Sequence, residues 1–241
     1  MKNLDKRLAD AVSHFWLTRT KQGEAQGRSS GSRDYGSRSE VTGGAQMDGF
    51  VQLVAELISE SGIPDAAVYR DQRLELPGFF RPTKEWDLLV VVDGQLLACC
   101  EFKSQVGSFG NNFNNRTEEA IGTATDLWTA YREGAFRGSP KPWLGWLMLL
   151  EKSEKSLTPV AVKEPHFPVF PEFKEASYAK RYELLCLKMV RERLYDSACL
   201  LLSDREDGSK GMCDQPNVEV GFRRLVASLT GHATAIARMR T

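Results

Sequence analysis

Two apolar stretches joined by a tight turn constrain this chain more than any other part of its sequence. Residues 86–92 and 95–103 are both rich in large apolar side chains, and Asp93-Gly94 separates them. Such stretches are typical of strands buried in a sheet, and Asp-Gly is a strong hairpin signal. We therefore expect two neighbouring antiparallel strands.

Charged residues stand at the ends of these strands. Asp87 opens the first, and Glu101 and Lys103 close the second. Because side chains alternate along a strand, Glu101 and Lys103 share one face. A two-residue turn would leave Asp87 on the other face. We therefore predict a three-residue loop over 92–94, closed by a glycine bulge, which pairs Asp87 with Cys99.

Helical and extended patterns alternate along the remaining chain. Helices are predicted over 4–17, 47–60, 116–133, 177–193 and 219–239, and further strands over 143–150 and 195–203. Asn115 and Glu118 form a capping-box pattern at the third helix. Four prolines make 157–173 a long loop. We expect an α/β (α+β) fold, a central mixed sheet flanked by helices, in one domain over 1–241.

Residues 18–46 differ in composition from their surroundings. They hold six glycines and five serines but no Leu, Ile, Phe, Trp or Met. Such a segment buries too little apolar surface to offset its ordering entropy, so a flexible surface segment is expected. The alternative is an arm that orders against a nucleic-acid backbone.

The composition narrows the class of protein. Basic and acidic residues balance at 32 each, which argues against coating nucleic acid by bulk charge. No apolar run is long enough to span a bilayer, and the N-terminus lacks the pattern of a secretory signal. Five cysteines without CxxC spacing suggest reduced core residues in a cytoplasmic protein rather than disulfides or zinc ligands.

The charged strand ends suit phosphodiester hydrolysis. Asp87 and Glu101 can bind Mg²⁺, which prefers oxygen ligands, and the backbone carbonyl of Phe102 can supply another. The metal stabilises charge on the phosphate and activates a bound water. The ammonium of Lys103 can orient that water. Acids and a lysine at such loose spacing also occur by chance, so the alternative is a structural ion-pair cluster.

These residues resemble the PD-(D/E)xK nuclease superfamily. Asp87 matches its first acid, Glu101 its second and Lys103 its lysine, whereas Trp86 stands where the superfamily usually has proline. The chain is further identified as a member of the XhoI family of type II restriction endonucleases. That similarity rests on segments 76–91 (LPGFFRPTKEWDLLVV), 108–124 (SFGNNFNNRTEEAIGTA) and 165–173 (PHFPVFPEF).

The resemblance implies a homodimeric, Mg²⁺-dependent enzyme acting on double-stranded DNA. It implies cleavage within the palindrome CTCGAG with 5′ overhangs. It also implies a cognate DNA methyltransferase that protects the same site in the host. The alternatives are another nuclease on this fold, acting in repair or junction resolution, and a DNA-binding protein that cuts nothing.

Several polar residues near the acids are candidates for DNA contact. They are Arg81, Lys84, Gln105, Asn111, Asn112, Asn114 and Arg116. Asparagine, glutamine and arginine can bind base edges, but the same segment also reads as a polar, turn-rich connection in which Asn115 caps a helix. Four further acids, Glu56, Glu60, Glu118 and Glu119, either assist the metal or occupy solvated helix faces.

Overall fold

The computed structural model describes residues 3–29 and 45–239. Its centre is a five-stranded sheet in the order β1, β4, β5, β6, β7. The strands are β1 (Val68–Tyr69), β4 (Leu88–Val92), β5 (Gln95–Gln105), β6 (Trp143–Glu151) and β7 (Ser197–Ser203). β4 is antiparallel to β1 and β5, whereas β5, β6 and β7 are parallel. The predicted α/β fold with a mixed sheet is confirmed.

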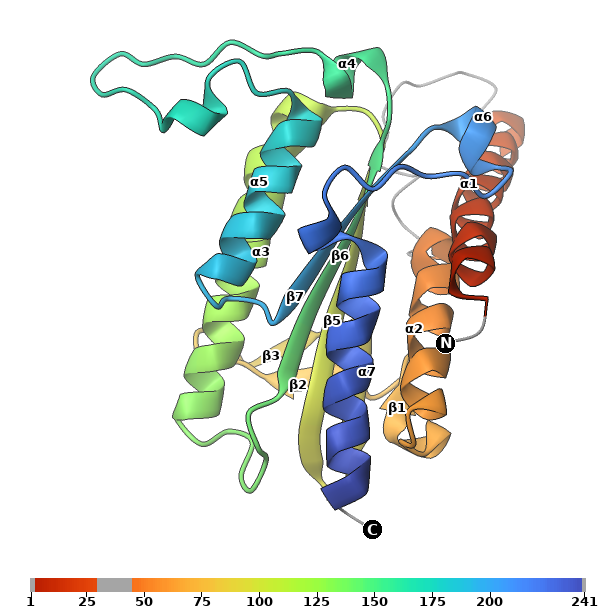
Figure 1. Ribbon diagram of the computed structural model, residues 1–241, viewed down its shortest axis with the longest axis vertical. Helices are drawn as coiled ribbons and strands as arrows, with labels where there is room; N and C mark the ends of the chain where they lie inside the picture. The colour runs from red at the N-terminus through yellow and green to blue at the C-terminus, as the bar shows by residue number, and fades with distance from the viewer. Residues whose placement is uncertain (1–2, 30–44, 240–241) are drawn as a thin grey trace.

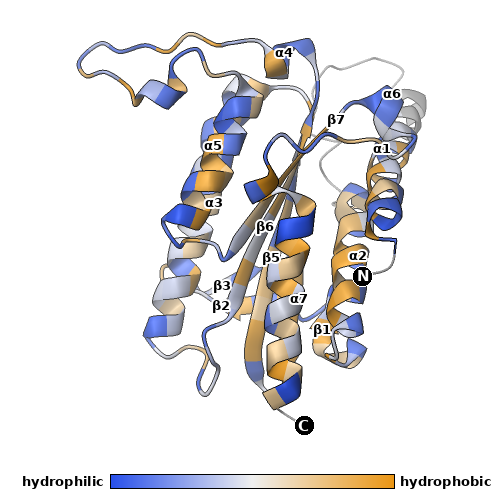
Figure 2. Ribbon diagram, in the orientation of Figure 1, coloured by the Kyte–Doolittle hydropathy of each residue, from blue (hydrophilic) through white to orange (hydrophobic). Residues whose placement is uncertain are grey.

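Helices cover both faces of the sheet (Figure 1). On one face lie α3 (Phe109–Arg132) and α5 (Tyr178–Arg191), which connect the parallel strands. On the other face lie α2 (Asp48–Glu60) and α7 (Phe222–Met239), with α1 (Leu4–Ser29) packed beside α2. Figure 2 shows how strongly apolar residues dominate α2. No helix in the described ranges is long and apolar enough to cross a bilayer.

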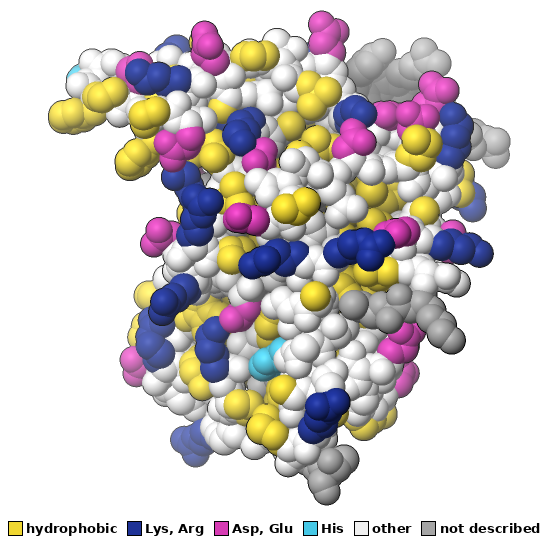
Figure 3. Space-filling model, in the orientation of Figure 1, with side chains coloured by type: hydrophobic (Ala, Val, Ile, Leu, Met, Phe, Trp, Pro, Cys, Tyr) yellow, Lys and Arg dark blue, Asp and Glu magenta, His cyan; other side chains and the backbone are white. Residues whose placement is uncertain are grey.

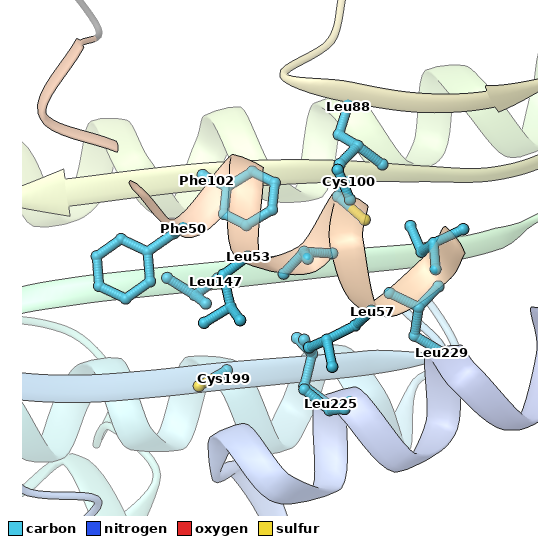
Figure 4. Packing of buried hydrophobic residues seen from close by; sticks show 14 of the residues in the cluster. Phe50, Leu53, Leu57, Leu88, Cys100, Phe102, Leu147, Cys199, Leu225 and Leu229 are labelled. Atoms are coloured by element: carbon cyan, nitrogen blue, oxygen red, sulfur yellow. The ribbon is translucent and has the colours of Figure 1, made fainter. Parts of the chain in front are cut away.

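The core beneath α2 explains why that helix forms. Phe50 and Leu57, both buried, point from α2 toward the sheet (Figure 4). They belong to one cluster with Cys100 of β5 and Leu147 of β6. Burying side chains of this size stabilises the fold by roughly 1.5–3 kcal/mol each. This packing holds α2 close to the end of β5 that carries the charged residues.

Short elements complete the structure. A two-stranded sheet, β2 (Glu75–Pro77) with β3 (Thr83–Glu85), precedes β4. The others are α4 (Glu154–Leu157), α6 (Arg205–Gly208), η2 (Ala45–Met47), η3 (Asp65–Ala67), η4 (Pro171–Phe173) and η5 (Val218–Val220). The predicted long loop is confirmed between α4 and η4 and projects from the body (Figure 1). Hydrophobic side chains gather on it (Figure 3), and Phe167 and Phe170 are 84% and 71% exposed.

The first helix is longer than predicted. It was expected to end at residue 17, with 18–46 flexible, but α1 continues to Ser29, and 45–47 form η2. Tertiary packing anchors the helix at its predicted end and over the first residues beyond it. Trp16 is fully buried and its Nε1 donates a hydrogen bond to Ser203 Oγ at 3.0 Å, while Arg19 is only 5% exposed. The rest of the predicted segment, 30–44, lies outside the described residues.

The third helix begins earlier than predicted. We expected a start at 116 with Asn115 as cap, but α3 starts at Phe109, directly after Gly107 and Ser108 in left-handed conformations. Aromatic packing on α5 accounts for the difference. Phe109 stacks on Tyr178 with ring centroids 5.9 Å apart, and Phe113, one turn later, also meets α5. The asparagine-rich segment is therefore helical rather than a loop.

The predicted hairpin loop was wrong, yet the acids still meet. The turn has two residues, Asp93 (φ 49°) and Gly94 (φ 77°), both left-handed as in a type I′ turn. A bulge at Leu97 then shifts the register, since Val91 pairs with Leu96 but Val90 with Ala98. The predicted pairing of Asp87 with Cys99 was therefore also wrong, because Cys99 pairs with Leu89. The extra residue in β5 instead brings Asp87 level with Glu101, which still leaves both acids on one face.

Candidate active site

Three charged side chains, those of Asp87, Glu119 and Lys84, converge on Lys103 and Glu101 near the end of β5. The Nζ atom of Lys103 lies 2.6 Å from Glu101 Oε2, 3.4 Å from Glu119 Oε1 and 4.0 Å from Asp87 Oδ2. The ammonium of Lys84 pairs with the other oxygen of Glu101. The three residues singled out in the sequence are therefore neighbours in space.

Neighbouring strands of the fold supply most of these side chains. Asp87 directly precedes β4, and its Oδ2 accepts a hydrogen bond from the Phe102 N–H at 2.6 Å. Glu101 and Lys103 lie two residues apart on β5, and their 2.6 Å contact confirms the shared face. Lys84 is on β3. The hairpin, its bulge and the short β3 strand thus build the cluster.

Burial makes the electrostatics of this cluster strong. Glu101 is almost fully buried, with 3% of its side chain exposed, whereas the carboxylate of Asp87 is 36% exposed. Burial raises the pKa of Asp87 and the nearby Glu101 raises it further, against the lowering effect of Lys103 and the Phe102 N–H. Two carboxylates are therefore crowded together at a site where one remains open to solvent.

Lys103 stays a cation in this setting. Burial alone would lower its pKa, but Glu101, Asp87 and Glu119 together raise it above the usual value for lysine. The same ion pairs lower the pKa of Glu119, although burial opposes this. Lys103 is therefore suited to hold a water or a phosphate oxygen by its charge, and not to act as a general base.

A cleft of about 570 Å³ opens in front of these residues. Asp87, Phe102 and Lys103 form its floor, together with Glu85, Trp86 and the last residues of β5. Its lining also includes Arg19 of α1, η2 with the start of α2, and Asn112 and Arg116 of α3. The cleft thus joins the cluster to polar side chains from three helical segments.

The residues predicted to contact DNA are dispersed. Only Asn112, Arg116 and Gln105 line the cleft, and Gln105 is 4% exposed. The amide of Gln105 is used inside the protein, where it accepts from Tyr182 Oη and donates to the Gly107 carbonyl. Asn111 lines a separate pocket near α4, and Asn114 is exposed on α3.

Arg81 and Lys84 have partners within the protein as well. Arg81 Nε pairs with Asp126 Oδ2 at 2.7 Å, which fixes the turn between β2 and β3. Lys84 joins Glu101, so the structure puts it within the charged cluster rather than at its margin.

The four acids with uncertain roles separate clearly. Glu56 and Glu60 both pair with Arg7 across α1 and α2, away from the cluster. Glu118 and Glu119 are both exposed and line the same side pocket near Arg81, but of the two only Glu119 pairs with Lys103 among the described residues. The sequence alone could not predict which of these adjacent glutamates reaches Lys103, because that depends on where α3 begins.

Comparisons with known proteins settle the family. The sequence model described as "Restriction endonuclease XhoI" matches residues 26–215. The chain belongs to the XhoI family of restriction endonucleases.

Relatives of the XhoI family cover most of this chain. The type II restriction enzyme BstVI of Geobacillus stearothermophilus is 51% identical over 213 residues, 86% of this chain and 95% of that enzyme. The type II restriction enzyme XhoI of Xanthomonas vasicola is 51% identical over 183 residues, 74% of this chain and 72% of that enzyme. AbrI of Azospirillum brasilense is 51% identical over 169 residues, 69% of this chain and 75% of that enzyme. No solved structure gives a significant match.

The chain is therefore a type II restriction endonuclease, a hydrolase that cleaves double-stranded DNA at specific sites. The family match covers the whole charged cluster, from Lys84 to Glu119. It also begins within α1, at residue 26, and so includes η2 and α2.

Proposed function

We propose that this endonuclease uses Asp87, Glu101 and Lys103 as a PD-(D/E)xK site to hydrolyse DNA with Mg²⁺. The observation that carries the proposal is the convergence of two carboxylates on one lysine at the floor of a cleft. Phosphodiester hydrolysis needs an anchored cation and a held water, and this arrangement can supply both.

The residues fit a magnesium ion. Asp87 and Glu101 offer oxygen ligands, and their crowding, seen in the raised pKa of Asp87, would be relieved by a divalent cation. No group of three or more Asp, Glu, His or Cys side chains in the described residues is arranged to hold a metal. The Phe102 carbonyl and water would therefore complete the shell, and Mg²⁺ usually keeps several waters.

When bound, the metal supplies charge stabilisation for the phosphate and a more acidic water. Lys103, held as a cation by Glu101 and Glu119, orients the attacking water and stabilises the charge that develops on the phosphate. Lys84 neutralises the second oxygen of Glu101 before the metal arrives. The two lysines thus hold the acids together and offset their charge while the site is open.

We further propose CTCGAG as the target, cut in both strands to leave 5′ overhangs. This rests on the resemblance to the XhoI family and on a relative of that name at 51% identity. A palindrome is read most simply by a two-fold dimer, so we propose a homodimer. A cognate methyltransferase would protect the host's copies. All five cysteines are free and four are buried, which suits the reducing cytoplasm.

Digestion of a plasmid of known sequence, with Mg²⁺ and then with EDTA, tests this function. Mapping of the ends should place every cut within CTCGAG, with 5′ extensions and no cutting in EDTA. Discrete fragments at another sequence would refute the target but keep the enzyme. Nicking that follows branched structure would favour a repair or junction nuclease, and binding without cleavage in any divalent metal would refute the catalytic site.

A further inference from the structure

Two further polar side chains line the same cleft as Asp87 and Lys103. Gln46, in η2, and Arg19, in α1, both line the cleft that has Asp87 and Lys103 at its floor. Each residue is only 5% exposed, which is unusual for side chains of this polarity. Neither residue belongs to the catalytic site proposed above.

Local packing holds this wall in place. His14 Nε2 lies 3.2 Å from the Ala45 carbonyl oxygen, which ties η2 to α1. A side chain at Gly49 would come within 3.1 Å of His14, so a glycine allows α2 to approach α1 this closely. Met47 is buried between them. Gln46 is therefore presented from a fixed turn rather than from a free loop.

The carboxamide of Gln46 has an unused acceptor. Its Oε1 atom is buried and has no hydrogen-bond partner among the residues that the structure describes. Buried polar atoms are nearly always paired, so an unpaired one on the wall of a binding cleft indicates a partner that arrives with the ligand. That partner must be a hydrogen-bond donor. Phosphate groups and deoxyribose within a DNA strand offer only acceptors, whereas base edges carry N–H donors.

We propose that Gln46 and Arg19 form a base-reading subsite, in which Gln46 binds an adenine edge and Arg19 a guanine edge. A glutamine amide matches adenine with two bonds, since Oε1 accepts from N6–H and Nε2 donates to N7. Arginine also matches guanine with two bonds, but it donates both, to O6 and N7. The target that we propose, CTCGAG, has one adenine in each strand with guanine on both sides. The inference rests on that proposed function.

Binding of duplexes with single-atom changes tests the Gln46 contact. Ca²⁺ replaces Mg²⁺ so that binding can be measured without cleavage, and one probe carries purine, which lacks the N6 amino group, in place of each adenine. The wild type should bind this probe about tenfold more weakly than CTCGAG, the range of a two-bond base contact. In Gln46→Ala the two duplexes should bind equally. If Gln46→Ala keeps the wild-type ratio, the subsite is overturned.

Two further variants make the result specific. Gln52→Ala removes the same side chain from the same cleft, but Gln52 Nε2 is already bonded to Glu56 at 2.8 Å, so the wild-type ratio should persist. Gln46→Glu keeps an acceptor and loses the donor. Its affinity for the duplex should still fall when the N6 amino group is removed, but not when 7-deazaadenine, which lacks N7, replaces adenine. A response to both analogues would contradict the assigned contact, and this comparison holds even if Gln46→Ala does not fold.

The Arg19 contact has its own probe. Duplexes with 7-deazaguanine at each guanine in turn should weaken wild-type binding at one position, and Arg19→Lys should abolish that difference. An unchanged difference at every position removes Arg19 from the subsite. If the wild type does not prefer CTCGAG to a scrambled duplex, the proposed target fails instead. The base analogues are then placed in the recognition sequence that plasmid mapping identifies. The same binding outcomes there decide whether Gln46 and Arg19 form the subsite.

Discussion

At the scale of single residues, Lys103 organises the site. Its ammonium contacts Glu101 and Glu119 and lies 4.0 Å from Asp87, so three carboxylates share one half-buried cation. Strand alternation, a local rule, was enough to predict that Glu101 and Lys103 share a face, whereas the place of Asp87 depends on a register shift that was predicted at the wrong position. Glu119 was not separable from Glu118 by any local rule, since both lie on the same helix in adjacent positions.

The adjacent glutamates give a matched test of positioning. Glu119→Ala should lower the single-turnover cleavage rate about tenfold, because Lys103 loses one of the partners that hold its ammonium over the site. The dissociation constant for the target and the thermal midpoint should stay unchanged. Glu118→Ala, at an exposed neighbouring position, should cleave at the wild-type rate. Equal rates for both variants would remove Glu119 from the account.

Asp126 is a structural acid with a pH signature. It accepts hydrogen bonds from Phe79 N–H, Phe80 N–H and Arg81 Nε. Burial alone would raise its pKa, but these partners lower it. A lowered pKa in the folded state means that the ionised group stabilises the protein above the unfolded value, about 3.9, and that this stability is lost as the pH falls through the folded value.

We therefore predict that Asp126→Asn lowers the free energy of unfolding by about 2 kcal/mol near pH 6. The difference from the wild type should begin to shrink below about pH 4, where Asp126 of the unfolded chain takes up a proton, and should shrink further as the pH falls through the lower pKa of the folded state. Urea unfolding between pH 6 and pH 3 measures this. A difference that stays constant over that range would show that the charge of Asp126 is not what stabilises the turn.

At the scale of elements, the sequence predicted which segments are helices and strands better than where they begin. The strands at 143–150 and 195–203 were recognised because continuous apolar runs need no tertiary context. The bulge at Leu97 was not predicted from the sequence, since it depends on how β5 pairs along its length. Likewise, α3 begins at Phe109 because its aromatic side chains meet α5, which no local pattern reveals.

The packing of α1 on the rest of the molecule carries a prediction. Trp16 is fully buried and bonded to Ser203, and a side chain at Gly208 would lie 2.1 Å from it. Trp16→Ala should therefore lower the free energy of unfolding by about 3–5 kcal/mol, as in other cores that lose a large aromatic. Leu17→Ala, on the exposed side of the same helix, should cost less than about 1 kcal/mol. Similar losses in both, by denaturant titration, would contradict the packing of α1.

At the scale of the whole molecule, equal numbers of basic and acidic residues limit attraction to DNA in general. Specific contacts in the cleft must then supply most of the discrimination. Two copies of the chain would double those contacts on a palindrome. Light scattering of the purified protein should therefore give a mass twice that of the 27.0 kDa chain. A monomer both alone and on its target duplex would contradict the proposed dimer.

The central claim is that Asp87, Glu101 and Lys103 are the catalytic groups of this restriction endonuclease. Single-turnover cleavage of a CTCGAG duplex in Mg²⁺, measured beside binding of the same duplex in Ca²⁺, tests it most directly. Asp87→Ala and Lys103→Ala should each slow cleavage by about a hundredfold to a thousandfold, while the preference for the target over a scrambled duplex is retained. Cleavage at the wild-type rate by either variant, in protein with normal binding, would contradict the account.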